Sequence, residues 1–173
     1  MINSLFTQTS QDEIPQVRKC SSLVLNDMIK LIPSVPEQDL FVIFANFYQD
    51  EQDSVRMAGI ESCIHFAKAL PMNKINEKLI PYIKKFAVDK SWRIRYLVAD
   101  KLMEISNGIG LENSREHLTT YFCQFLEDTE SEVRTAAVRR LQDFGKILDA
   151  KTLINNVIPS LVKLQTDQFT YVR

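Results

Sequence analysis

The sequence predicts an all-α fold in which helical hairpins stack on one another. Three observations carry this prediction. The chain of 173 residues contains only 4 Gly and 6 Pro, too few for the frequent turns of a β-sandwich or barrel. A short motif recurs at an interval of about 39 residues. Between its copies, apolar residues are spaced by three and four positions, which places them on one face of a helix.

The recurring motif is an Asp followed six residues later by an Arg, with Val or Ile directly before the Arg. Its five copies begin at Asp12, Asp50, Asp89, Asp128 and Asp167 and end at Arg18, Arg56, Arg95, Arg134 and Arg173. Both positions advance by 38, 39, 39 and 39 residues from copy to copy. Such constant spacing indicates a fold built from internal repeats.

A first helix is expected before each Asp, because apolar residues lie 10, 6 and 3 positions before it. In the first copy this stripe is weaker, since Thr9 stands where the others have Phe or Leu. We expect Pro81 and Pro159 near the starts of their helices, where the missing N–H costs least. The residues of the stripe are Leu40, Phe44, Phe47; Leu79, Ile83, Phe86; Leu118, Phe122, Phe125; and Val157, Leu161, Leu164.

A second helix is expected to begin near each Val-Arg or Ile-Arg pair, with Pro15 opening the first of them. Pro33, Pro36, Pro71, Gly108 and Gly110 follow these helices, where a helix should stop. In these second helices, apolar residues recur at three equivalent positions, and each set of equivalent residues forms a column. The columns are Cys20, Ala58, Leu97, Ala136; Met28, Phe66, Ile105, Phe144; and Ile32, Leu70, Ile109, Leu148. The first column is mostly small, as expected where two helices approach closely.

A helical hairpin of this size cannot bury both of its apolar faces alone, so it must stack on its copies. The period and the two helices in each copy favour an α-solenoid of HEAT repeats over three-helix armadillo repeats. We expect a single array over residues 1–173, with repeats at about 1–35, 36–73, 74–112, 113–151 and an incomplete one at 152–173. Because the last copy stops in the first turn of its expected second helix, we expect a piece of a longer array.

Composition and motifs narrow the classes of function. Lys and Arg number 21 and Asp and Glu 22, which argues against nucleic acid as a partner. No apolar run approaches the roughly 18 residues of a membrane span. Cys20, Cys63 and Cys123 are odd in number and widely spread, which indicates reduced, intracellular cysteines. We expect a cytoplasmic location, with the nucleus as a second one.

Neither catalysis nor metal binding finds support in the sequence. No HExxH, P-loop, GxGxxG or GxSxG motif occurs. Cys63 and His65 are two residues apart and therefore face different sides of a helix. We expect no enzyme activity, no cofactor and no metal.

We expect the repeated Asp and Arg to be structural. One repeat's Asp can lie beside the Arg of a neighbouring repeat, which would give a ladder of charge-assisted hydrogen bonds. The alternative is direct contact with a partner. The ladder would comprise Asp12, Arg18, Asp50, Arg56, Asp89, Arg95, Asp128, Arg134, Asp167 and Arg173.

Trp92 is the only tryptophan, and its place in the repeat predicts an exposed turn residue. An exposed Trp beside Arg93 and Arg95 is typical of an interface anchor. The alternative is that the ring folds back onto Tyr96 or a neighbouring turn. The equivalent positions in the other repeats are Pro15, Asp53, Ser131 and Thr170.

Five segments resemble the scaffold (A) subunit of type 2A protein serine/threonine phosphatases. The two most specific are residues 50–56 (DEQDSVR) and residues 89–96 (DKSWRIRY). Residues 12–19, 98–101 and 131–134 extend the match. The resemblance covers nearly the whole chain and corresponds to the middle of that scaffold, from about its fifth repeat to the start of its ninth.

The resemblance implies a non-catalytic HEAT scaffold whose turns within repeats form a continuous ridge. In the family, the amino-terminal half of the ridge holds the regulatory (B-type) subunit, and carboxy-terminal repeats absent from this chain hold the catalytic subunit. Lys19 stands where the family usually has a second Arg, and Lys cannot form the bidentate fork. The matching ridge positions are Glu13, Pro15, Arg18, Lys19, Glu51, Asp53, Ser54, Ser91, Trp92 and Arg93.

Two other classes of HEAT protein remain as alternatives. A nuclear-transport receptor would usually carry acidic inner helices, and no acidic stripe of that kind appears here. A helical-repeat DNA glycosylase would need a basic groove with an aromatic and acidic pocket, for which one Trp beside two Arg is not enough.

Overall fold

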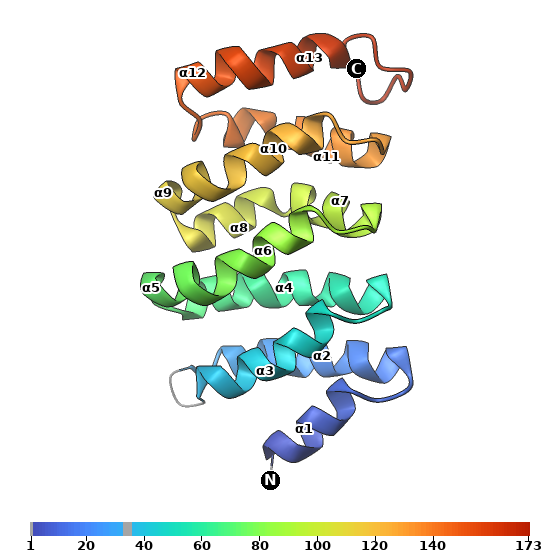
Figure 1. The fold of residues 1–173 in the computed structure, drawn as a ribbon, viewed down its shortest axis with the longest axis vertical. Helices are drawn as coiled ribbons and strands as arrows, with labels where there is room; N and C mark the ends of the chain where they lie inside the picture. Colours follow the sequence, from blue (N-terminus) through green and yellow to red (C-terminus); the bar gives the residue numbers. More distant parts are fainter. Residues whose placement is uncertain (1, 33–35) are drawn as a thin grey trace. The chain divides into compact units, whose positions relative to one another are not determined.

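The computed structural model describes residues 2–32 and 36–173, which are helices joined by turns (Figure 1). The chain forms two compact units, residues 1–83 and residues 84–173. Among the described residues, no helix is both long and apolar enough to cross a lipid bilayer.

Unit 1 contains two layers of helices. One layer holds α1 (Ile2–Ser10) and α3 (Glu37–Tyr48), and the other holds α2 (Pro15–Ile29) and α4 (Asp53–Ala69) (Figure 1). After α4, the short helix α5 (Met72–Lys74), the π-helix η1 (Ile75–Leu79) and α6 (Ile80–Ala87) follow without a break. The boundary between the two units falls inside α6.

Unit 2 repeats this arrangement. Its second helices are α7 (Trp92–Asp100) with α8 (Leu102–Ile109), which pack on α11 (Ser131–Phe144). Its first helices are compound: α9 (Leu111–Asn113), η2 (Ser114–Leu118) and α10 (Thr119–Leu126), and then α12 (Ala150–Thr152), η3 (Leu153–Val157) and α13 (Ile158–Leu164). The first helices of the two repeats pack on one another through α10 and α13.

The apolar columns of the sequence form the core of each unit. Phe44, Phe47 and Phe66 are fully buried in unit 1, and Phe122 and Phe144 are fully buried in unit 2. Phe44 and Phe66 lie with their ring centroids 5.5 Å apart, and the equivalent Phe122 and Phe144 are 4.9 Å apart. The same pair of helix faces therefore meets in both units.

The column of small residues does not behave as expected. Only Ala136 is buried, whereas Ala58 and Leu97 are half-buried and Cys20 is exposed. Asn26 and Ser62 do meet between α2 and α4, where the Ser62 hydroxyl donates a buried 2.7 Å hydrogen bond to the Asn26 side chain.

The prolines of the first helices lie further from the amino-terminal ends of their helices than the sequence predicts. The helices begin at Met72 and Ala150, so Pro81 and Pro159 are each the second residue after a π-helical turn. A proline ring clashes with the carbonyl four residues back, and a π turn widens the backbone at that point. Thr120 occupies the equivalent place in the fourth repeat and also follows a π turn. Proline is therefore not the only cause of the π turns.

Two helix ends also differ from the prediction. The second helix of the third repeat is interrupted at Lys101, although Ile105 still donates its N–H to the Lys101 carbonyl at 3.0 Å. Residues 169–172 form a turn, with the Val172 N–H bonded to the Phe169 carbonyl at 3.1 Å, where a second helix was expected to begin. Pro15 does open α2, as expected, while Pro33 lies outside the described residues.

Candidate partner-binding ridge

Each repeated Asp shapes the turn that it begins. Its carboxylate accepts the backbone N–H of the residue two positions on, which is an Asx turn. The donors are Ile14, Gln52, Ser91, Glu130 and Phe169, at 2.8–2.9 Å from the respective Oδ1 atoms. The first four of these donors directly precede a second helix. The carboxylate therefore sets the angle at which the chain enters that helix.

The repeated Arg closes the same turn from its other side. The Nη1 atom of Arg18, Arg56, Arg95 or Arg134 donates to the carbonyl of the Asp six residues earlier, at 2.7–2.9 Å. It also donates to the carbonyl of the next residue, at 3.0–3.4 Å. The Asp and the Arg thus fix one turn together, and this is why their spacing is constant.

Bidentate hydrogen bonds join the Arg of one repeat to the Asp of the next repeat within each unit. In unit 1, Arg18 donates from Nε and Nη2 to Asp50 at 2.5 and 2.9 Å. In unit 2, Arg95 donates to Asp128 at 2.7 and 2.8 Å, and Arg134 to Asp167 at 2.7 and 3.0 Å. These six side chains are only 5–17% exposed.

The two ends of the motif series differ from the middle. Asp12 caps its own turn by accepting the Ile14 N–H. Arg173 is exposed. Arg56 is 4% exposed and is held by the carbonyls of its own turn.

Asp128 has a lowered pKa although it is partly buried. Burial acts to raise this pKa, but the hydrogen bonds from Arg95 and from the Glu130 N–H outweigh it. The folded state therefore favours the ionised carboxylate.

Acid should remove the contribution of Asp128 to stability. A lowered folded pKa stabilises the protein above the ordinary value of 3.8, and this stabilisation is lost as the pH falls through the folded value. In urea titrations, the difference in unfolding free energy between the natural chain and Asp128→Asn should shrink from about pH 4 downward. A difference that grows with acidification would contradict this.

The expected ridge residues lie in the turns or near the starts of the second helices that follow them, and their exposure differs. Glu13, Pro15, Lys19 and Glu51 are exposed in unit 1. Asp53 and Ser54 are half-buried at the start of α4. Arg18 directs its guanidinium into the ladder, where Nε, Nη1 and Nη2 all donate to oxygens of the chain. Its guanidinium therefore has little hydrogen-bonding capacity left for a partner.

Trp92 is half-buried rather than exposed. It is the first residue of α7, directly after Ser91, which is half-buried too. The exposed Arg93 places its guanidinium over the indole, 4.8 Å from the ring centroid. A cation over an aromatic face is electrostatically favourable, and it accounts for the partial covering of the ring.

Sequence reasoning missed the grooves that lie between successive turns. In unit 1 a groove runs between the turns at Asp12 and Asp50 and is lined also by Asn46 and Gln49. In unit 2 an equivalent groove runs between the turns at Asp89 and Asp128 and is lined also by Gln124 and Glu127. Both pairs of additional residues stand four and one positions before the repeated Asp, so the repeat register could have found them.

An aromatic pair on the last turn was also missed. Phe169 and Tyr171 are 37% and 57% exposed, and their ring centroids lie 5.5 Å apart. The Tyr171 hydroxyl lies 2.8 Å from Ser131 Oγ on the preceding turn. This contact joins two successive turns of unit 2.

Among the residues that the structure describes, no three His, Cys, Asp or Glu side chains lie together in a way that could hold a metal ion. Burial raises the pKa of the Cys63 thiol far above its ordinary value. Burial also lowers the pKa of His65. The buried thiol is therefore protonated at neutral pH and has the low reactivity of a structural cysteine.

The carboxy-terminal third of the chain matches a known family model. Residues 112–173 match the model described as PPP2R1A-like HEAT repeat. The fold of the chain is accordingly an α-solenoid of HEAT repeats, which confirms the predicted fold class.

The curated relatives of this HEAT protein are phosphatase regulatory subunits. It is 30% identical to the beta isoform of the human 65 kDa regulatory A subunit of serine/threonine-protein phosphatase 2A over 119 residues, covering 66% of this chain and 20% of the relative. It is 28% identical to the regulatory A subunit of Schizosaccharomyces pombe protein phosphatase PP2A over 107 residues, covering 61% and 18%. These matches confirm the resemblance to the 2A scaffold. The chain spans about a fifth of the length of these relatives.

Solved structures support the fold. The structure of Cex1p superposes with a TM-score of 0.74 at 23% identity, covering 99% of this HEAT protein and 33% of that chain. An engineered protein superposes with a TM-score of 0.56 at 14% identity, covering 99% and 75%. At these identities the likeness concerns the fold alone.

Proposed function

We propose that this HEAT protein is a non-catalytic scaffold that binds a regulatory (B-type) subunit of a type 2A protein phosphatase through its turns within repeats. The observation that carries the proposal is the sequence similarity to the regulatory A subunits of 2A phosphatases, which includes 30% identity over 119 residues. The alternatives with acidic inner helices or a DNA-binding groove gain no support from any observation above.

The turns suit this function because they are held rigidly. The first four turns are each fixed by their own Asp and Arg, and the bidentate pairs join successive turns within a unit. Binding then needs little ordering of the scaffold, and a preorganised surface loses less free energy on association.

The exposed charges of the turns differ between the units. The unit 1 turns expose Glu13 and Glu51 beside Lys19, whereas the third turn, in unit 2, exposes Lys90 and Arg93. A partner segment with complementary charges would therefore favour one unit over the other.

Replacing Trp92 by Ala should weaken binding of a B-type subunit by about 2 kcal/mol, or roughly 30-fold in Kd. The half-buried indole and the exposed Arg93 guanidinium lie against one another beside the third turn, and Trp and Arg side chains are typical hot spots. The affinity can be measured by titration calorimetry, and the melting temperature should change little.

Val42→Ala is the control for this variant. Val42 is 64% exposed on α3, away from the turns, so neither affinity nor melting should change. A lower melting temperature with unchanged affinity for Trp92→Ala would contradict the proposed contact. The isolated catalytic subunit, titrated in parallel, should give no saturable binding.

A further inference from the structure

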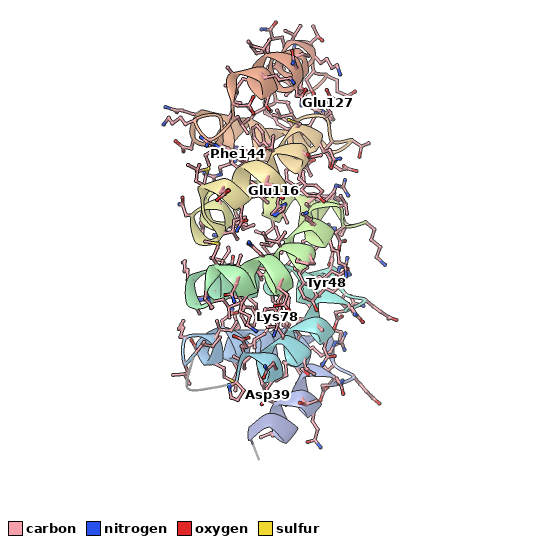
Figure 2. All side chains as sticks on the ribbon, turned by 60° about the vertical axis from the view of Figure 1, so that its left-hand side comes forward. Asp39, Tyr48, Lys78, Glu116, Glu127 and Phe144 are labelled. Carbon is pink, nitrogen blue, oxygen red and sulfur yellow. The ribbon has the colours of Figure 1, made fainter. Side chains whose placement is uncertain are left out.

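A groove opens between two first helices of unit 2, outside the turns assigned to the ridge. It lies between α10 and the compound helix η3–α13 and has a volume of about 430 Å³. Glu127, which follows the last residue of α10 and is labelled in Figure 2, lines it. Its walls are formed by Thr119, Thr120, Cys123, Gln124, Asn156 and Ser160, among others.

The equivalent interface of unit 1 is filled by large side chains. Tyr82 of α6 lies against α3, with ring centroids 4.9 Å from Phe44, 5.2 Å from Tyr48 and 6.4 Å from Phe41. The Lys78 ammonium lies 5.6 Å from the centroid of the Phe41 ring. These contacts place aromatic side chains between the two first helices.

The repeat register shows why the groove of unit 2 is open. Two repeats correspond to an offset of 78 residues. At this offset, Phe41, Lys78 and Tyr82 of unit 1 correspond to Thr119, Asn156 and Ser160 of unit 2. Each replacement is smaller than its counterpart, and one of the three removes a phenol ring from the space between the helices. Helices α10 and α13 pack directly on one another. The groove of unit 2 therefore lies at the repeat positions where unit 1 has the rings of Phe41 and Tyr82.

The walls of the groove are polar but carry no net charge. Gln124, Asn155 and Asn156 present exposed side-chain amides. The two charged groups neutralise one another, because Lys163 Nζ donates to Glu127 Oε1 at 2.8 Å. Ser160 donates to the same oxygen at 2.8 Å. A neutral ligand with amide groups matches this lining, whereas a charged one finds no counter-charge.

The groove adjoins the surface assigned to the partner. Gln124 and Glu127 line it and also line the groove between the turns at Asp89 and Asp128. A partner bound along the turns of unit 2 could therefore extend a segment between α10 and α13 without leaving the surface.

We propose that this groove receives an uncharged aromatic side chain, carried on an extended segment of the bound regulatory subunit. The inference rests on the proposed function. The entering ring replaces the one that Tyr82 supplies in unit 1 and lies against the Thr119 methyl, the Cys123 sulfur and Pro159. Sulfur contacts with aromatic rings are favourable. The amides of Gln124, Asn155 and Asn156 bind the backbone of the segment.

The first test uses N-acetyl-L-tyrosine amide as a probe, followed by NMR of the side-chain amides. The probe should shift the resonances of Gln124, Asn155 and Asn156 in a saturable way, and N-acetyl-glycine amide should not. Ser160→Tyr restores the ring found at Tyr82 and should abolish the shifts. Val162→Tyr, which adds the same ring to α13 at a 58% exposed site outside the groove, should leave them unchanged.

The second test measures binding of the regulatory subunit. Ser160→Tyr should raise Kd at least tenfold, and Asn156→Lys, at an exposed site, should raise it at least threefold even if the tyrosine variant folds poorly. Val162→Tyr should bind as the natural chain does. Loss of all binding by the natural chain would refute the proposed function itself. Unchanged binding by the two groove variants, or probe shifts that persist in Ser160→Tyr, would overturn the groove inference alone.

Discussion

Replacing Phe44 by Ala should lower the free energy of unfolding by about 3–5 kcal/mol. Phe44 is fully buried, and its ring contacts Phe41, Phe66 and Tyr82 at centroid distances of 6.1, 5.5 and 4.9 Å. The truncation leaves a cavity between α3, α4 and α6 that rigid helices fill only in part. Urea unfolding followed by far-ultraviolet circular dichroism measures the loss.

Val42→Ala is the matched control, because Val42 lies on the same helix but is 64% exposed. This change should stay within about 0.5 kcal/mol of the natural chain. Similar losses for the two variants would show that Phe44 does not pack as described. Because contacts in a repeat array join only neighbouring repeats, the Phe44 variant should also unfold less cooperatively, with residues 2–83 melting first.

Replacing Arg95 by Ala should cost about 3 kcal/mol, since it removes one member of a largely buried ion pair. The variant loses two hydrogen bonds to Asp128 and two to the carbonyls of Asp89 and Lys90. The Asp128 carboxylate, which is 8% exposed, then keeps the hydrogen bonds from the Glu130 N–H and the Thr129 hydroxyl but has lost its counter-charge. Arg18 makes the same kind of contacts to Asp50, Asp12 and Glu13 in unit 1, so Arg18→Ala should cost a similar amount.

The first Asp of the series provides a control for the ladder. Asp12→Asn keeps an oxygen for the Ile14 N–H and disturbs no bidentate pair, so thermal melting should change by less than about 2 °C. Asp128→Asn removes the charge opposite Arg95 and should lower the melting temperature by several degrees. Equal and negligible effects at both positions would show that the bidentate pairs contribute nothing to stability.

The sequence predicted the helices because their signal is local. Apolar residues at −10, −6 and −3 from each Asp define one face of a helix whatever surrounds it, and Phe44 and Phe122 are accordingly buried. The sequence also located each turn, because an Asp carboxylate bonds to the N–H two residues on without any help from the rest of the fold. The π turns before Pro81 and Thr120 escaped prediction, since two different residues follow the same widened backbone.

By itself, then, the sequence determined the period, the two helices of each repeat, the turns and their resemblance to a phosphatase scaffold. Only the tertiary structure decided how side chains from different repeats share space. Trp92 is half-covered because Arg93 lies over its ring. The groove between α10 and α13 escaped prediction because the space between two first helices depends on residues of two repeats at once. Local periodicity fixes which face of a helix is buried, whereas the filling of an interface depends on the sum of side-chain volumes that meet there.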